Sequence, residues 1–161
     1  MRNNYKLLLI SALIITISWG TIHFLSHDKR TAKAFAEEFY AIQLPPKTTV
    51  IDQNFNYGVF YGGGPWGSGG RPTVVAYKKL SSELSEKELV NYYTSNPPLE
   101  GVEIYFKWEE KGVTTADNEK KWYEGKTPKQ PSEENNTGSP IEVIIQLREE
   151  FESAFGEFAR Y

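Results

Sequence analysis

The sequence predicts an α+β protein: an N-terminal transmembrane helix followed by a small, mainly antiparallel sheet of about four strands, with helices on one face. Three observations carry this prediction. Residues 7–26 contain no Asp, Glu, Lys or Arg. Four later stretches carry the residues typical of strands and are bounded by prolines, glycines or polar residues. Other stretches repeat apolar residues at helical spacing.

The uncharged stretch is long enough to cross a bilayer. Twenty residues in a helix reach about 30 Å, which is the thickness of the hydrocarbon core. Because lipid offers the backbone no hydrogen-bond partner, such a stretch satisfies its own backbone groups as a helix. We therefore expect a single-pass membrane anchor over residues 1–27 and one water-facing domain over residues 28–161.

A cleaved secretory signal peptide is the alternative to an anchor. Ala32-x-Ala34 and Ala34-x-Ala36 both fit the small-residue rule for cleavage sites. The apolar stretch is, however, longer than the core of a usual signal peptide, and the charged residues 28–30 separate it from both sites. These two features favour a retained anchor.

Charge and composition limit the partners. The formal net charge is −3, and five basic residues against one aspartate give +4 through residue 33, which leaves −7 on residues 34–161. An acidic domain repels phosphate backbones, so we expect no nucleic-acid partner. The short head before the apolar stretch favours a cytoplasmic N-terminus and an extracytoplasmic domain at the cell membrane. The chain has no cysteine, which excludes disulfides and thiolate metal sites.

Two residue patterns lie within or beside the anchor. Ala12, Thr16 and Gly20 recur every four residues, which places small side chains on one face where a second helix can approach closely. His23 and His27 share a face as metal ligands do. The zinc-protease pattern needs Glu directly after the first His, and Phe24 occupies that position. We therefore expect no metal here.

The first half of the domain is predicted to contain two helices and two strands. Helical spacing over residues 28–42 indicates a helix that leaves the membrane and docks on the domain. Strands follow over residues 48–55 and 72–80. A capping box at residues 85–88, Ser-Glu-Lys-Glu, then begins a second helix. The expected buried face of that helix consists of Leu89, Tyr92 and Tyr93.

The second half is predicted to add two strands and a short terminal helix. A strand over residues 101–108 places one set of residues on a single face: Val102, Ile104, Phe106 and Trp108. Residues 109–140 are polar and broken by glycines and prolines, so we expect a flexible loop with a short added strand at Trp122-Tyr123. Residues 141–147 close the sheet, with Ile141, Val143, Ile145 and Leu147 on one face. Phe151, Phe155 and Phe158 then follow at helical spacing, which predicts a short terminal helix with the three rings on one face.

The segment between the first two strands is the candidate contact surface. Residues 57–71 combine seven glycines with four aromatic residues. The spacing Gly62-x-Gly64-x-x-Gly67 matches a dinucleotide fingerprint, but Pro65 and the prolines and glycines that follow forbid the helix that this fingerprint requires, so no cofactor is expected. Aromatic rings can stack on a flat ligand or clamp a peptide. The alternative is a lid lying on the sheet. The contact candidates are Tyr57, Tyr61, Trp66 and Arg71.

Some of these features resemble a set of small, uncharacterised single-pass membrane-anchored proteins of Gram-positive bacteria. The likeness covers residues 35–108. It consists of Leu44-Pro45-Pro46 before a strand, a glycine-rich connection, and the helix start at residues 84–93. This resemblance implies a membrane anchor, but no activity and no functional residues.

Three functions are consistent with these patterns. The first is a non-enzymatic envelope module that binds a protein or a wall polymer through residues 57–71. The second is an accessory subunit of a membrane complex, held through its helix. The third is a hydrolase with paired carboxylates, for which the strand residues Glu103 and Glu142 are the candidates. We expect the first function, and no enzyme.

Overall fold

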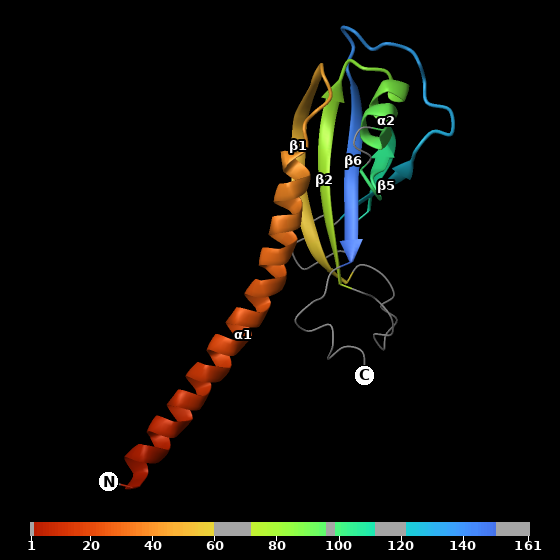
Figure 1. Cartoon of the computed structure of the whole chain (residues 1–161). Coiled ribbons are helices and arrows are strands. Elements are labelled where there is room, and N and C mark those ends of the chain that lie inside the picture. Colours follow the sequence, from red (N-terminus) through yellow and green to blue (C-terminus); the bar gives the residue numbers. More distant parts are fainter. Residues whose placement is uncertain (1, 60–71, 96–98, 112–121, 151–161) are drawn as a thin grey trace.

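The computed structural model describes residues 2–59, 72–95, 99–111 and 122–150. The elements in order are α1 (Arg2–Ala41), β1 (Thr48–Val59), β2 (Pro72–Ser82), α2 (Glu86–Ser95), β3 (Glu103–Tyr105), β4 (Lys107–Lys111), β5 (Trp122–Lys126) and β6 (Ile141–Glu150). A four-stranded antiparallel sheet has the order β1-β2-β6-β3, and β4 pairs with β5 in a separate sheet. The predicted α+β class and mainly antiparallel sheet are confirmed (Figure 1).

Helix α1 runs without a break through the predicted anchor and the predicted docking helix. Its N-terminal half projects away from the sheet (Figure 1). Apolar side chains are exposed there, from 54% for Ile10 to 71% for Trp19. Nearer its C-terminus, Ala32, Ala36 and Phe39 are buried on one face. Segment Ile10–Ala41 is long and apolar enough to cross a membrane, a property that a signal sequence shares.

One buried cluster joins both helices to the main sheet. Alternate residues of a strand point to the same face, and this face is formed by Ala76 and Leu80 of β2 with Val143 and Ile145 of β6. These four side chains pack with residues of α1 and α2, namely Ala36, Phe39, Leu89 and Tyr93. On the expected inward face of the last strand, Val143 and Ile145 are therefore buried, whereas Ile141 and Leu147 are half-buried. Tyr92, expected inside, is only half-buried.

The other face of the main sheet is covered by the hairpin formed by β4 and β5. Tyr77 and Ile144 of the main sheet form a second buried cluster with Tyr105 and Tyr123. The rings of Tyr77 and Tyr123 meet edge to face, 4.8 Å between centroids. Strand β5 confirms the short added strand predicted at residues 122–123. The centre of β6 is consequently buried on both faces.

The predicted single strand over residues 101–108 is wrong. The chain bends at Phe106, so β3 stays in the main sheet and β4 leaves it to pair with β5. Ile104 lies in the helix-side cluster, whereas Trp108 packs against the second cluster. Alternation alone cannot reveal this change, because both halves of the stretch keep a period of two.

The segment between β5 and β6 follows the start of α2. The Lys87 amide donates to the Ser132 carbonyl oxygen over 3.0 Å, and the Asn136 amide donates to that of Glu83 over 3.1 Å. The side-chain amide of Asn136 also donates to the Leu84 carbonyl oxygen. These bonds give the second part of the expected loop over residues 109–140 a defined path. The terminal helix predicted around Phe151 lies outside the described residues.

A buried lysine of β2 binds the carbonyl groups at the C-terminal end of α1. Lys78 of β2 is 3% exposed, and its Nζ donates to the carbonyl oxygens of Tyr40 and Ile42 over 3.2 and 3.1 Å. It also lies 5.3 Å from the centre of the Phe39 ring. The last carbonyl groups of a helix lack hydrogen-bond partners within the helix. Lys78 supplies the missing donor and so connects the end of α1 to a central strand. Burial lowers the pKa of Lys78.

Gly125 of β5 marks a close approach of the hairpin to β3 and to its own partner strand. An added Cβ would lie 2.5 Å from the Lys107 carbonyl oxygen and 3.0 Å from Tyr105 Cβ. Because a backbone atom cannot swing aside as a side-chain tip can, Gly125→Ala is expected to lower the free energy of unfolding by about 2 kcal/mol. Urea unfolding of the full chain in detergent measures this loss.

Gly20→Ala is the matched control, because a Cβ there would meet nothing within 4 Å. It should leave the urea midpoint of the domain unchanged. An unchanged midpoint for Gly125→Ala as well would contradict the close approach at β5.

Candidate functional site

Of the four predicted contact residues, only Tyr57 belongs to the described part of the chain. Tyr61, Trp66 and Arg71 lie outside it. Tyr57 is half-buried near the end of β1 and pairs with Val74 of β2. The ends of β1 and β2 meet at this point, and the end of β6 lies beside them. In Figure 1 this end of the sheet points in the direction in which the N-terminal half of α1 extends.

The predicted helix-packing face is open in the structure. Ala12 and Thr16 are exposed, and space is free around the Cα of Gly20. The Thr16 hydroxyl donates to the Ala12 carbonyl oxygen over 2.9 Å, so its polar group is satisfied within the helix. The three residues therefore share one face that leaves the backbone accessible.

The two carboxylates considered for hydrolysis do not form a pair. Glu103 lies opposite Gln146 of β6, and Glu142 lies four residues earlier on the same strand. Four residues of a strand span about 13 Å, more than the carboxyl separation of about 5 to 9.5 Å in glycoside hydrolases. Glu142 instead pairs with Lys79, at 2.8 Å. Neither carboxylate lines the hollow at the start of α2 or the hollow beside the hairpin of β4 and β5.

Glu103 belongs to a polar network between the main sheet and the hairpin. It accepts hydrogen bonds from Gln146 Nε2 over 2.6 Å and from the Tyr105 hydroxyl over 2.9 Å. Arg148 Nε donates to its other oxygen over 2.6 Å. Burial, followed by the nearby Glu103, raises the pKa of Tyr105 to about 12. The phenol is therefore neutral at physiological pH and acts as a donor.

Gln146 connects this network to β5. Its side chain is fully buried. Its Oε1 accepts from the Tyr123 amide over 2.9 Å, and its Nε2 donates to the Tyr123 carbonyl oxygen over 3.1 Å. One side-chain amide thus takes the place of a neighbouring strand and fixes the hairpin on the sheet. The sequence signal was a single polar residue within the apolar run of residues 143–147, which strand periodicity did not single out.

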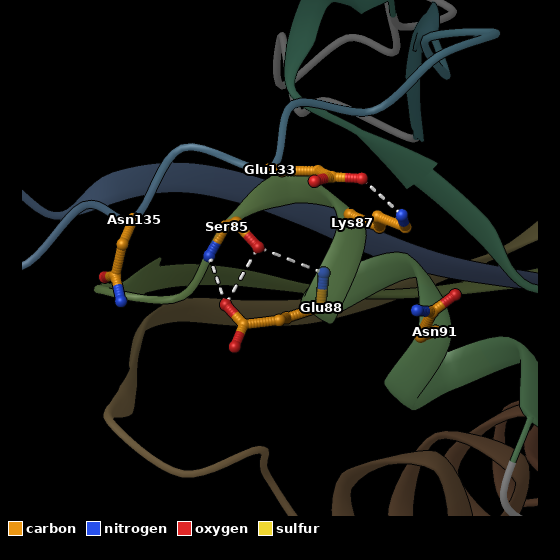
Figure 2. A pocket seen from close by; sticks show the side chains of 6 residues that line it. All are labelled: Ser85, Lys87, Glu88, Asn91, Glu133 and Asn135. Carbon is orange, nitrogen blue, oxygen red and sulfur yellow. Dashed lines mark hydrogen bonds and ion pairs between the residues drawn. The ribbon is translucent and has the colours of Figure 1, made fainter.

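A polar hollow of about 350 Å³ lies at the start of α2, and Figure 2 shows its six lining residues. Glu88 Oε2 accepts from the Ser85 amide and the Ser85 hydroxyl, both over 2.8 Å. Lys87 forms an ion pair with Glu133. The predicted capping box is confirmed. The Ser85 bonds lower the pKa of Glu88, which weakens it as a general base, so this arrangement serves helix capping.

Ser85→Ala is expected to lower the free energy of unfolding by about 1 kcal/mol, as loss of an N-cap does. The lowered pKa of Glu88 in the folded state adds a pH dependence. Its stabilising contribution is present above the pKa of the unfolded carboxyl and disappears as the pH falls through the folded pKa. The difference between Ser85→Ala and the unchanged chain should therefore be largest near neutral pH and shrink in acid.

Thermal unfolding at several pH values measures this difference. Ser95→Ala, at the exposed end of the same helix, is the control and should have no effect. A Ser85→Ala difference that grew in acid would contradict the assignment of Glu88 as an ionised partner of Ser85.

A second hollow, of about 700 Å³, lies beside the hairpin. Four charged residues of β4 and β5 line it together with Glu86 of α2 and the apolar residues Phe106, Trp108 and Pro128. Lys79 Nζ lies 5.4 Å from the centre of the Trp108 ring. No residue of this hollow was among the predicted contact candidates. The four hairpin charges are Lys107, Glu109, Glu124 and Lys126.

Comparisons with protein-family models, curated proteins and solved structures find no match to this chain. The resemblance to membrane-anchored proteins of Gram-positive bacteria therefore stays a prediction.

Proposed function

We propose that the protein is a single-pass membrane protein whose α1 anchors an extracytoplasmic domain close to the bilayer. The carrying observation is that one continuous helix has exposed apolar side chains in its N-terminal half and buried Ala36 and Phe39 near its C-terminus. An exposed apolar surface of this kind is favourable in lipid and costly in water. The two parts of α1 thus serve two environments.

Retention of the anchor is supported by the docking of α1. Both candidate cleavage sites lie inside the helix, between or at the buried residues Ala32 and Ala36. Cleavage after Ala36 would remove two side chains that the folded domain buries. The proposal takes α1 and α2 to cover the same face of the sheet, because both contribute to one buried cluster.

The orientation can be tested by cysteine labelling, because the chain has no cysteine of its own. Lys129→Cys places a thiol at an exposed position of the domain, and Asn3→Cys places one before the apolar stretch. A membrane-impermeant maleimide should label Lys129→Cys in intact cells and Asn3→Cys only after permeabilisation. The reverse pattern would overturn the extracytoplasmic assignment.

We further propose that the domain is a non-enzymatic module that binds a protein or envelope polymer through the loop of residues 57–71. The support is the position of the loop's two ends. β1 ends and β2 begins on the side toward which the apolar half of α1 extends (Figure 1). A loop that begins and ends there starts near the bilayer surface, where a membrane-bound or wall-bound partner is within reach.

A crosslinking pull-down from membranes tests this contact. The full chain is compared with a variant in which Tyr57, Tyr61 and Trp66 are changed to Ala. We expect the variant to lose a partner that the unchanged chain recovers. A matched control changes Tyr92→Ala on α2, a half-buried tyrosine far along the chain from the loop. Equal recovery of every partner by all three proteins would remove the loop from consideration.

The open face around Gly20 favours a second candidate, an accessory subunit held through α1. Thr16→Ile with Gly20→Ile would fill that face while keeping it apolar. If this variant loses the partner and the loop variant keeps it, the protein is held through its helix. If the reverse holds, binding belongs to the loop.

A further inference from the structure

The hairpin carries two rows of like charge on one face. Lys107 of β4 lies directly opposite Lys126 of β5, and Glu109 lies directly opposite Glu124. Directly opposed side chains in an antiparallel pair have Cβ atoms about 5 Å apart, and like charges at that spacing destabilise the pair. Two like-charge pairs on the same face therefore each lower the stability of the hairpin, which points to a role for these charges other than stabilising the hairpin itself.

The four charged residues of this face line the second hollow beside Glu86 of α2. Trp122, farther along the same face, is buried beside Val75 of β2. On the opposite face of the hairpin, the rings of Trp108 and Tyr123 pack edge to face with centroids 6.4 Å apart, and Tyr123 is buried against the sheet. Lys107, Glu109 and Lys126 are exposed. Within the described ranges, no ion pair joins these three to another residue. Glu124 is half-buried and accepts from Trp122 Nε1 over 3.1 Å.

The arrangement of one lysine row beside one glutamate row determines which kind of partner can bind this face favourably. A uniformly charged surface, such as nucleic acid or an acidic lipid layer, would meet one attractive row and one repulsive row. A favourable partner must present a negative row and a positive row about 7 Å apart, which is the spacing of two residues along a strand. A second copy of the same face has this pattern.

We propose that the face formed by Lys107, Glu109, Glu124 and Lys126 is a contact surface between two copies of this chain. A two-fold axis that lies between the rows and runs across the strands turns one hairpin over onto the other. Lys107 then faces Glu109 of the second copy, and Lys126 faces its Glu124. By symmetry each contact occurs twice, as in an isologous interface. The four pairs replace the repulsion within each hairpin by attraction between hairpins.

Two charge reversals on β4 test this surface. In Lys107→Glu, the introduced carboxylate faces Glu109 of the second copy at two symmetry-related places. In Glu109→Lys, the introduced ammonium faces Lys107 in the same way. Each variant alone should associate about tenfold more weakly than the unchanged chain. An equimolar mixture of the two variants should regain the original strength, because the introduced charges then face each other with opposite sign.

Association is measured on the full chain in detergent micelles by energy transfer between labelled copies. The label sits on a cysteine introduced at Glu134, an exposed residue outside the rows. Lys129→Glu makes the same charge change at another exposed lysine and should leave association unchanged. Far-ultraviolet circular dichroism confirms that each variant is folded.

The outcomes separate this surface from the others. Restoration in the mixture, with higher salt weakening association, supports the proposal. The proposal is overturned if the unchanged chain does not self-associate, if both reversed variants associate as strongly as it does, or if mixing them restores nothing. Persistent association in both variants would assign self-contact to another region, such as the Gly20 face of α1. None of these results bears on partner binding by residues 57–71.

Discussion

Gln146→Leu is expected to lower the free energy of unfolding by about 3 kcal/mol, the largest single loss in this domain. Leucine has nearly the same volume, so the change removes hydrogen bonds rather than packing. The Tyr123 amide and carbonyl oxygen lose their partners in a buried place. Glu103 loses a donor at 2.6 Å. Each buried polar group left unpaired costs about 1 to 3 kcal/mol.

Urea unfolding of the full chain in detergent measures this loss. Gln53→Leu is the control, because it makes the same chemical change at an exposed position of β1 and should shift stability by less than about 0.5 kcal/mol. We also expect the tryptophan fluorescence of Gln146→Leu to report a loosened hairpin, since Trp108 and Trp122 lie on β4 and β5. Equal stability of both variants would mean that Gln146 does not hold the hairpin on the sheet.

Lys78→Met should cost about 2 kcal/mol, because the carbonyl oxygens of Tyr40 and Ile42 lose their charged donor. Methionine keeps the length of the side chain and avoids burying an ammonium group, whose cost is visible in the lowered pKa of Lys78. That relief is smaller than the loss of two charge-assisted bonds. Lys78→Ala should cost more, since it also removes the stem that packs beside Phe39.

Hydrogen exchange resolves where the loss occurs. Amides in the last turns of α1 should exchange faster in Lys78→Met, while those at the centre of β6 follow only the global change in stability. Lys129→Met alters an exposed lysine and should change neither. Unchanged exchange at the end of α1 would show that the helix is held on the sheet by packing alone.

Local patterns in the sequence predicted most of the elements. The capping box at Ser85, the apolar alternation of β6 and the helical spacing around Phe39 each encode a local preference that tertiary contacts reinforce. Strand ends were less accurate: β1 continues to Val59 and β2 to Ser82, because pairing extends strands beyond their strongest propensity. Element identity was thus easier to predict than length.

The features that join the elements were not predictable in the same way. Lys78 and Gln146 are polar residues in strands, and periodicity assigns such residues to solvent. Their burial depends on carbonyl and amide groups supplied by α1 and β5, which are far away in the sequence. The bend at Phe106 places β4 on the other face of the sheet. It likewise depends on contacts distant in sequence, namely the pairing of β4 with β5 and the packing of Trp108 against the second cluster. Of the four candidate contact residues, only Tyr57 lies in the described part of the chain, so the contact loop stays a prediction.

The hydrogen bonds of Lys78 and Gln146 matter for the proposed function. Lys78 fixes the end of α1 to a central strand, and Gln146 fixes the hairpin to the same sheet. The apolar half of the helix, the ends of β1 and β2, and the charged face of the hairpin therefore belong to one connected body. The domain therefore presents its surfaces at defined positions relative to α1.

The central claim, that α1 is a retained membrane anchor, is tested most directly by alkaline carbonate extraction of membranes followed by mass measurement of the recovered polypeptide. We predict that the protein stays in the membrane pellet and that its mass includes residues 7–26. Release of the protein into the carbonate supernatant, or a mature chain that begins near Phe35 or Glu37, would contradict it.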